Sequence, residues 1–158
     1  MMEGNETERG GGKMAKEGCI LIVDDEAGPR ESLKMVLKPH YEIHTASNGQ
    51  EALDLLGKEK IDVVTLDLKM PGLSGFDVLK EIKKMKAEIE VVIITSQGTL
   101  PAAREAIHYG AGDFITKPFN IVDVINIISK AFERRNYKKK IQGLIKEIKD
   151  LGAKGEKK

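Results

Sequence analysis

The sequence predicts an α/β domain in which helices cover both faces of a parallel β-sheet. From Cys19 onward, strand-like and helix-like segments alternate five times along the chain. Repeated β–α units of this kind form parallel sheets through right-handed crossovers. Three of the strand-like segments are continuous apolar runs, as expected of strands that are buried on both faces. The 158 residues, 41% of them hydrophobic, suffice for one such domain with further segments at its ends.

The strands are expected where apolar and β-branched residues run between turn residues. In chain order they are Cys19–Val23, Tyr41–Thr45, Ile61–Leu66, Val91–Thr95 and Asp113–Thr116.

Helix-start signals lie between these strands. Pro29 suits the first turn of the first helix, Gly57 follows the expected end of the second, and Gly110 closes the fourth. The second to fifth helices each begin after a polar residue that can cap them: Asn48, Ser74, Thr99 and Asn120. In the fifth helix, the predicted buried stripe consists of Ile121, Val124, Ile125 and Ile128.

The two ends of the chain differ from the domain between them. Residues 1–18 contain five glycines and no periodicity, which predicts disorder. Residues 19–135 form the predicted folded domain. Residues 136–151 form a basic, amphipathic helical extension, and residues 152–158 a disordered tail that Gly152 begins. The apolar stripe of the extension has three- and four-residue spacing and comprises Ile141, Leu144, Ile145, Ile148 and Leu151.

Charge is unevenly distributed along the chain. Residues 19–132 carry 13 basic and 17 acidic side chains, whereas residues 133–158 carry 10 basic and 4 acidic ones. A charge run on an extended helix is typical of a solvated face, and the apolar stripe also fits a coiled coil or a docking helix. Nucleic-acid binding is the least favoured interpretation, because the tail has no helix-turn-helix and Tyr137 is its lone aromatic residue.

Composition limits the remaining classes. Cys19 is the single cysteine, so an internal disulfide is excluded and a reducing, cytoplasmic location is expected. No apolar run reaches transmembrane length, so we expect no membrane insertion. His40, His44 and His108 show no metal-ligand spacing with one another or with Cys19, which favours packing or surface roles for all four residues.

Charged residues follow three of the predicted strands. Asp24 and Asp25 follow the first, Asp67 the third and Lys117 the fifth. The carboxyl ends of parallel strands meet at one edge of the sheet, where ligands bind in open α/β folds. Carboxylates that converge there would repel one another unless a hard cation such as Mg²⁺ joined them. The sequence therefore predicts a metal-plus-phosphate site, with Asp67 as nucleophile and Thr95 as a nearby hydroxyl.

Taken together, these residues resemble the receiver domain of two-component response regulators, the CheY-like fold. The resemblance covers residues 19 to about 132 and rests on the order and spacing of Asp24-Asp25, Asp67 with Met70-Pro-Gly72, Thr95, and Lys117-Pro-Phe119. It implies a flavodoxin-like strand order of 2-1-3-4-5. It also implies that the protein is a phosphorylation-controlled switch rather than an enzyme acting on other substrates.

The resemblance assigns roles to single residues. Asp67 would accept a phosphoryl group from a sensor histidine kinase or a histidine phosphotransfer protein. Asp25, Asp67 and the backbone carbonyl of Lys69 would bind Mg²⁺ directly, and Asp24 through water. Lys117 would contact the phosphoryl group, while Thr95 and Phe114 would form the switch. Lys69 and Gln97 occupy variable positions that tune dephosphorylation.

The resemblance also implies a downstream protein target, and a homodimer through the C-terminal helix or through the face made by the fourth helix, fifth strand and fifth helix. Three other functions compete with a stand-alone receiver. A haloacid-dehalogenase-type phosphatase would need an acid where Lys69 stands. A phosphorylation-independent adaptor and a receiver fragment of a longer regulator are the others.

Overall fold

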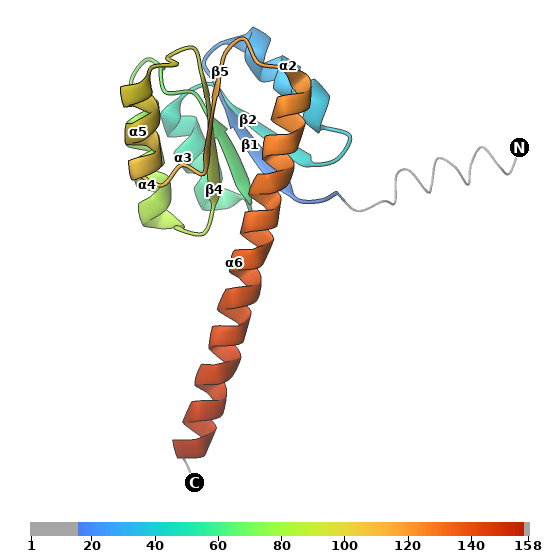
Figure 1. The fold of residues 1–158 in the computed structure, drawn as a ribbon, viewed down its shortest axis with the longest axis vertical. Coiled ribbons are helices and arrows are strands. Elements are labelled where there is room, and N and C mark those ends of the chain that lie inside the picture. Colours follow the sequence, from blue (N-terminus) through green and yellow to red (C-terminus); the bar gives the residue numbers. More distant parts are fainter. Residues whose placement is uncertain (1–15, 157–158) are drawn as a thin grey trace, which may run out of the picture.

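The computed structural model describes residues 16–156, which form a five-stranded parallel sheet of order β2-β1-β3-β4-β5 (Figure 1). The predicted strand order and α/β class are confirmed. The strands are β1 Cys19–Val23, β2 Glu42–Ala46, β3 Val63–Leu66, β4 Glu90–Thr95 and β5 Asp113–Thr116. The helices are α2 Ala27–Leu37, α3 Gly49–Lys58, α4 Gly75–Met85, α5 Leu100–His108 and α6 Ile121–Glu156.

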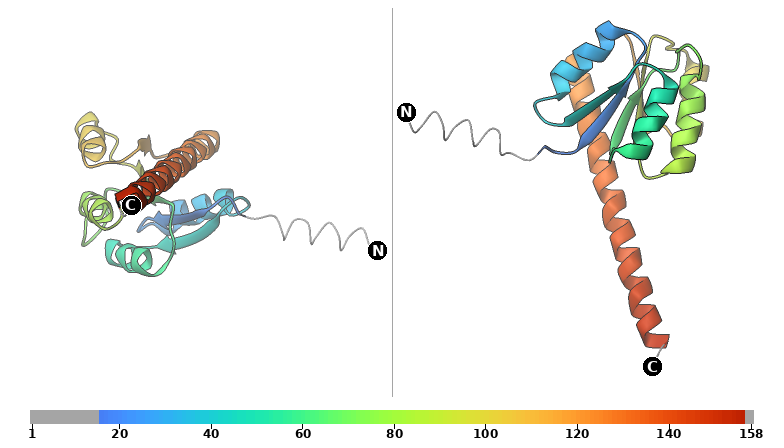
Figure 2. Two further views of the ribbon diagram at one scale, coloured as in Figure 1. Left: turned by 90° about the horizontal axis from the view of Figure 1, so that it is seen from below. Right: turned by 180° about the vertical axis from the view of Figure 1, so that it is seen from behind.

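Helices cover both faces of the sheet, with α3, α4 and α5 on one face and α2 and α6 on the other (Figures 1 and 2). Side chains alternate between the faces along each strand, so β1 supplies Leu21 and Val23 to the first core and Ile20 and Ile22 to the second. All five β1 residues are buried, which explains its uninterrupted apolar sequence.

The predicted helix caps are confirmed at four helices. The side chains of Asn48, Ser74 and Thr99 accept hydrogen bonds from the backbone N–H groups of Glu51, Asp77 and Ala102. Asn120 Oδ1 accepts from the backbone N–H of Val122. Two predicted helix ends need comment: Gly57 lies inside α3 rather than after it, whereas Gly110 follows α5 with a φ of 104°, as a helix-terminating glycine does.

The predicted buried stripe of the last helix is half wrong. Val124 and Ile128 are buried against the sheet, but Ile121 and Ile125 are 52% and 43% exposed. Residues three and four apart share a helix face only approximately, and α6 packs across β4 and β3. The sheet therefore covers one narrow row of α6, and Ala131 and Phe132 continue that row.

Helix α6 does not end where the sequence predicts. It runs through Gly152 and Gly155 to Glu156, so the predicted disordered tail begins too early. A glycine within a helix costs only about 1 kcal/mol relative to alanine, and neither Gly152 nor Gly155 adopts the positive φ with which a glycine typically terminates a helix.

At the other end, the ordered structure starts before the predicted Cys19 boundary. The Glu17 N–H donates to the His40 carbonyl at 2.9 Å, and the Glu42 N–H donates to the Gly18 carbonyl at 2.9 Å. The rest of the predicted disordered segment, residues 1–15, lies outside the described residues, as do residues 157–158.

The start of the helical extension is bound to the sheet by two sets of ion pairs, which we call the clasp. Arg134 Nε donates to Glu90 Oε1 at 2.7 Å, and Lys138 pairs with the other oxygen of Glu90. One residue further along, Lys139 Nζ donates to Asp62 Oδ1 at 2.9 Å and Arg135 Nε lies 3.6 Å from the same oxygen. Part of the positive charge of the C-terminal helix is therefore neutralised by acidic residues of the same chain.

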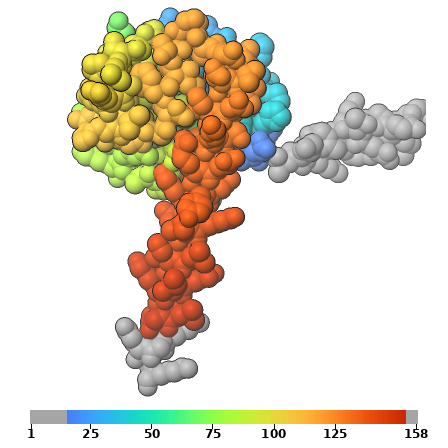
Figure 3. Space-filling view, viewed as in Figure 1, coloured from blue at the N-terminus to red at the C-terminus, as the bar shows by residue number. Residues whose placement is uncertain are grey.

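Beyond the clasp, α6 leaves the domain and projects from it as a single helix (Figure 3). Every residue from 139 to 153 is exposed. Within residues 16–156 no helix has both the length and the hydrophobicity needed to cross a membrane.

Candidate functional site

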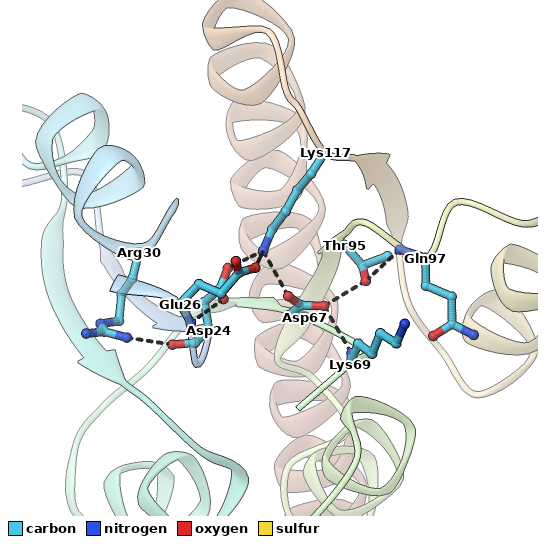
Figure 4. A network of polar contacts seen from close by, with 8 residues as sticks. All are labelled: Asp24, Glu26, Arg30, Asp67, Lys69, Thr95, Gln97 and Lys117. Carbon is cyan, nitrogen blue, oxygen red and sulfur yellow. Dashed lines mark hydrogen bonds and ion pairs between the residues drawn. The ribbon is translucent and has the colours of Figure 1, made fainter. Parts of the chain in front are cut away.

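The carboxyl ends of β1, β3, β4 and β5 bring Asp24, Asp67, Thr95 and Lys117 together (Figure 4). The Asp67 N–H donates to the Val23 carbonyl at 3.1 Å, and the Lys117 N–H donates to the Thr95 carbonyl at 2.8 Å. These backbone bonds continue the parallel ladders past the strand ends, so each functional side chain starts from a defined position.

Lys117 lies at the centre of the site. Its Nζ is 2.7 Å from Asp24 Oδ2, 2.9 Å from Asp67 Oδ2 and 3.3 Å from Glu26 Oε1. The Lys117–Pro118 peptide bond is cis. One ammonium group therefore serves three carboxylates, which leaves an excess of negative charge.

Asp67 is buried, at 2% exposure, and both of its carboxylate oxygens are engaged. Oδ1 accepts from Thr95 Oγ1 at 2.7 Å and from the Lys69 N–H at 3.0 Å. Oδ2 accepts from Lys117. The hydroxyl of Thr95 is thus committed to Asp67 here, as Figure 4 shows.

The turn after Asp67 is closely packed beneath it. Gly75, the first residue of α4, donates its N–H to the Leu68 carbonyl at 3.0 Å. A Cβ on Gly75 would lie 2.2 Å from the Asp67 carbonyl oxygen. The absence of a side chain at this position is therefore what lets α4 approach the strand end that carries Asp67.

The acidic residues converge as the sequence predicts, with one addition. Asp24, Asp25, Glu26 and Asp67 each offer a carboxylate oxygen, and these atoms all lie within 4.8 Å of one another. Glu26 was missed from the sequence because its position after an acidic pair reads as a helix-start residue. Its backbone N–H donates to Asp24 Oδ1 at 2.9 Å, and its carboxylate lies 3.3 Å from Lys117 Nζ. An all-oxygen donor set fits Mg²⁺.

The pKa values of Asp24 and Lys117 are both raised, but for different reasons. Burial raises the pKa of Asp24, and the hydrogen bond from Lys117 offsets part of that effect. Burial alone would lower the pKa of Lys117, but its hydrogen bonds to Asp24 and Asp67 raise it well above the usual range. Lys117 is therefore a permanent cation, whereas Asp24 is a carboxylate that a second positive charge would favour.

Phe114 lies next to Thr95 on the same face of the sheet. Phe114 on β5 pairs with Ile93 on β4, and Thr116 pairs with Thr95. Phe114 is half-buried against the core under α3, α4 and α5.

Comparison with known proteins gives a consistent result. Residues 20–139 match the model of the response regulator receiver domain. The chain is 40% identical over 112 residues to sporulation initiation phosphotransferase F of Bacillus subtilis, a match that covers 70% of this chain and 90% of that protein. It is also 40% identical over 116 residues to the chemotaxis protein CheY of Thermotoga maritima, covering 70% of this chain and 97% of that one.

A solved structure with the same fold is a CheY-like receiver domain protein from Methanospirillum hungatei. It superposes with a TM-score of 0.74 at 25% identity, and the match covers 77% of this chain and 98% of that one. The residues matched by the receiver-domain model, 20–139, include Asp24, Asp67, Thr95 and Lys117.

Proposed function

The chain belongs to the response regulator receiver domain family of two-component signalling, and we propose that it is switched by Mg²⁺-dependent phosphorylation of Asp67. The observation that carries this proposal is the buried Asp67 carboxylate, bound by Lys117 and Thr95 and surrounded by three further acids. The donor is a sensor histidine kinase or a histidine phosphotransfer protein. Residues 19–135 form the receiver, and a cytoplasmic location stays a prediction.

Mg²⁺ would be held by the carboxylates of Asp25 and Asp67 and the carbonyl of Lys69, with Asp24 acting through water. Glu26 is a further oxygen donor at the same place. When bound, the ion would offset the negative charge of the acids and of the incoming phosphoryl group.

In the transfer step, an Asp67 oxygen forms a bond to phosphorus while the bond between phosphorus and the donor breaks. The electron pair of the broken bond leaves with the donor. Lys117 is a cation already 2.9 Å from the attacking carboxylate, so it can neutralise a phosphoryl oxygen without a large movement. Water later hydrolyses the acyl phosphate and restores the carboxylate. Lys69 lies two residues after Asp67, and Gln97 lies two residues after Thr95. We propose that these two residues set the rate of the hydrolysis.

Phosphorylation adds about 1.5 to 2 negative charges and three acceptor oxygens. Thr95 would then exchange its hydrogen bond to Asp67 for one to the phosphoryl group, and Phe114 would occupy the space that Thr95 leaves. The surface that would change is the α5–β5–α6 face. The exposed large apolar side chains of α5 and of the start of α6 are Leu100, Ile107, Ile121, Val122 and Ile125. We propose this face as the binding surface for a downstream protein or a second copy of the chain.

The phosphodonor would approach beside Lys117. A cavity of about 630 Å³ opens there between α2 and the start of α6. Its lining combines Lys117 with apolar side chains that include Val36, Phe119 and Ile121.

Intact mass after incubation with acetyl phosphate and Mg²⁺ tests the phosphorylation proposal. The native chain should gain one phosphoryl group, and Asp67→Ala should gain none. Asp54→Asn, a change at an exposed carboxylate on α3, is the matched control and should be phosphorylated like the native chain. Incorporation that persists in Asp67→Ala would contradict the assignment.

We also propose that residues 136–151 mediate homodimerisation. Ile141, Leu144, Ile148 and Leu151 recur at alternating three- and four-residue spacing and are 39% to 68% exposed, which is the pattern of a coiled-coil seam. The clasp would hold this seam at a fixed angle to the receiver.

Sedimentation of the native chain and of Leu144→Asp/Ile148→Asp tests this association. The native chain should sediment as a dimer and the double variant as a monomer. Lys146→Asp, between the seam positions, is the matched control for added negative charge. An unchanged mass in the double variant would exclude the seam.

A further inference from the structure

The amino ends of the strands, opposite the phosphorylation site, form a second row of charged and polar residues. In sheet order they are Glu42 on β2, Cys19 on β1, Asp62 before β3 and Glu90 on β4. The clasp neutralises Asp62 and Glu90 with four cations from α6. Among the described ion pairs, the one cation that reaches Glu42 is the imidazole of His44, which is charged only when protonated.

Three different metal-ligating groups meet around Glu42, the part of this row that the clasp does not reach. Cys19, Glu42 and His44 each offer one ligand atom, and these atoms lie within 4.8 Å of one another. Strand register produces the arrangement: Cys19 pairs with Glu42 and Leu21 pairs with His44, so all three side chains share one face of β1 and β2. Glu59, just after α3, adds a second carboxylate 4.0 Å from His44 Nε2.

We propose that Cys19, His44, Glu42 and Glu59 bind a borderline-soft divalent transition metal ion, with Zn²⁺ as the best fit. A thiolate, an imidazole and carboxylates are the donors that Zn²⁺ takes in proteins. Ligands about 2.0 to 2.3 Å from a tetrahedral ion lie roughly 3.3 to 3.8 Å apart. His44 Nε2 is 3.7 Å from Glu42 Oε1, so this pair already has that spacing.

The surroundings of the Cys19 thiol also suit a metal ligand. Its side chain is 6% exposed, and among the described residues no hydrogen bond to its thiol is found. Packing against Leu21 and Leu56 in the core would explain its burial. Packing does not explain why an imidazole and a carboxylate gather beside its sulfur, with a second carboxylate, that of Glu59, near that imidazole.

The local charges also favour a cation. Burial, followed by the charges of Glu42, Asp62 and Glu59, raises the pKa of the Cys19 thiol to about 12. The thiol is therefore protonated when no cation is bound. A bound dication would reverse this field, and Cys19 would release its proton to solvent as the sulfur–metal bond forms. Such a site would join the edge strand β2 and the end of α3 to β1.

Titration of the full chain with Co²⁺, followed by absorption spectroscopy, tests this proposal. Since Cys19 is the single cysteine of the sequence, a thiolate-to-cobalt charge-transfer band can come from no other residue. We expect one thiolate-bound Co²⁺ per chain, a band whose intensity is independent of dilution at saturating Co²⁺, and loss of the band when Zn²⁺ is added.

Variants separate a built site from adventitious binding. Cys19→Ser should abolish the band, and His44→Gln should weaken Co²⁺ binding by at least about tenfold. The matched controls His108→Gln and Asp67→Asn should keep it. Zn²⁺ should raise the midpoint of thermal unfolding of the native chain and of Asp67→Asn by more than it raises that of His44→Gln.

Three results would overturn the proposal. They are the absence of a band at saturating Co²⁺, a band of unchanged affinity in His44→Gln, and a band that disappears on dilution because two chains share the ion. Because His44 is partly exposed on an edge strand, His44→Gln should fold even if Cys19→Ser does not.

Discussion

The two ends of the sheet use the same kinds of residues in opposite proportions. At the carboxyl end, one lysine, Lys117, contacts three carboxylates. At the amino end, four cations from α6 contact two carboxylates, Asp62 and Glu90. The carboxyl end therefore retains a need for positive charge, which a metal ion can meet, whereas each carboxylate of the clasp at the amino end is already paired with two cations.

This difference separates a reactive site from an anchor. A carboxylate in an undercompensated cluster can take up a cation and then an anionic phosphoryl group. A carboxylate that is already bound by two cations, such as the buried Glu90, cannot take up a further cation. It instead fixes the direction of α6. If the comparison holds, changes at one end should alter chemistry and changes at the other should alter stability.

The largest effect is expected at the carboxyl end. Lys117→Ala should slow phosphoryl transfer from acetyl phosphate by about 10²- to 10³-fold, the usual loss when one positioned charge or donor is removed. The initial rate of mass gain at saturating Mg²⁺ measures it. Lys58→Ala, on an exposed lysine at the end of α3, controls for the loss of one positive charge. A rate within a few-fold of the native one would break the comparison.

Removing the cations of the clasp should affect stability instead. Arg134→Ala/Lys138→Ala leaves Glu90 buried with Lys83 as the remaining nearby cation. We expect the free energy of unfolding to fall by about 2–3 kcal/mol, somewhat less than for a fully stranded buried charge. Urea unfolding measures this change. The control, Lys146→Ala/Lys149→Ala on the free part of α6, should have no such effect, and phosphorylation should be unchanged in both variants.

The packing of the two ends of the sheet can be compared at two glycines, Gly75 at the carboxyl end and Gly112 at the amino end. A Cβ on Gly75 would meet backbone atoms of Asp67 and Leu68 at 2.2 and 2.4 Å, whereas one on Gly112 would meet the side chains of Arg134 and Glu90 at 2.7 and 2.8 Å. Side chains can move and backbone cannot, so Gly75→Ala should cost about 3 kcal/mol and Gly112→Ala about 1 kcal/mol. Urea unfolding of both variants gives the order. Equal costs would contradict the rigidity assigned to the carboxyl end.

The smallest effect concerns acid. Although burial alone would raise the pKa of Glu90, its hydrogen bonds to Lys138 and Arg134 hold it below the ordinary value of 4.5. The resulting stabilisation is present above pH 4.5 and is lost as pH falls through the lowered pKa. We expect about 1 kcal/mol, because water screens the two partly exposed cations.

Urea unfolding of the native chain and of Glu90→Gln at several pH values tests this prediction. The native chain should be the more stable near neutral pH, and the difference should shrink on acidification. A difference that stays constant over that range would show that Glu90 is not the titrating group.

Most of the carboxyl end was predictable from the sequence because strand ends are readable locally. Apolar runs that stop at Asp24, Asp67, Thr95 and Lys117 place these residues at one edge of any parallel sheet. Glu26 was not predictable, since the contact of its carboxylate in the site is with Lys117, 91 residues away in the chain.

The amino end was much harder to predict. Nothing in the spacing of Cys19 and His44 indicates that they meet, because their proximity comes from the register of two parallel strands. The exposure of Ile121 and Ile125 likewise depends on how narrow a row of α6 the sheet can cover.

By itself, the sequence determined the α/β class, the helix caps and the reactive edge. Each of these depends on residues adjacent in the chain or on a rule that all parallel sheets obey. Tertiary structure alone decided that the basic run of α6 binds Asp62 and Glu90, which are 77 and 48 residues away from Lys139 and Lys138. Charge composition is visible in a sequence, but the partner of each charge depends on which elements the fold brings together.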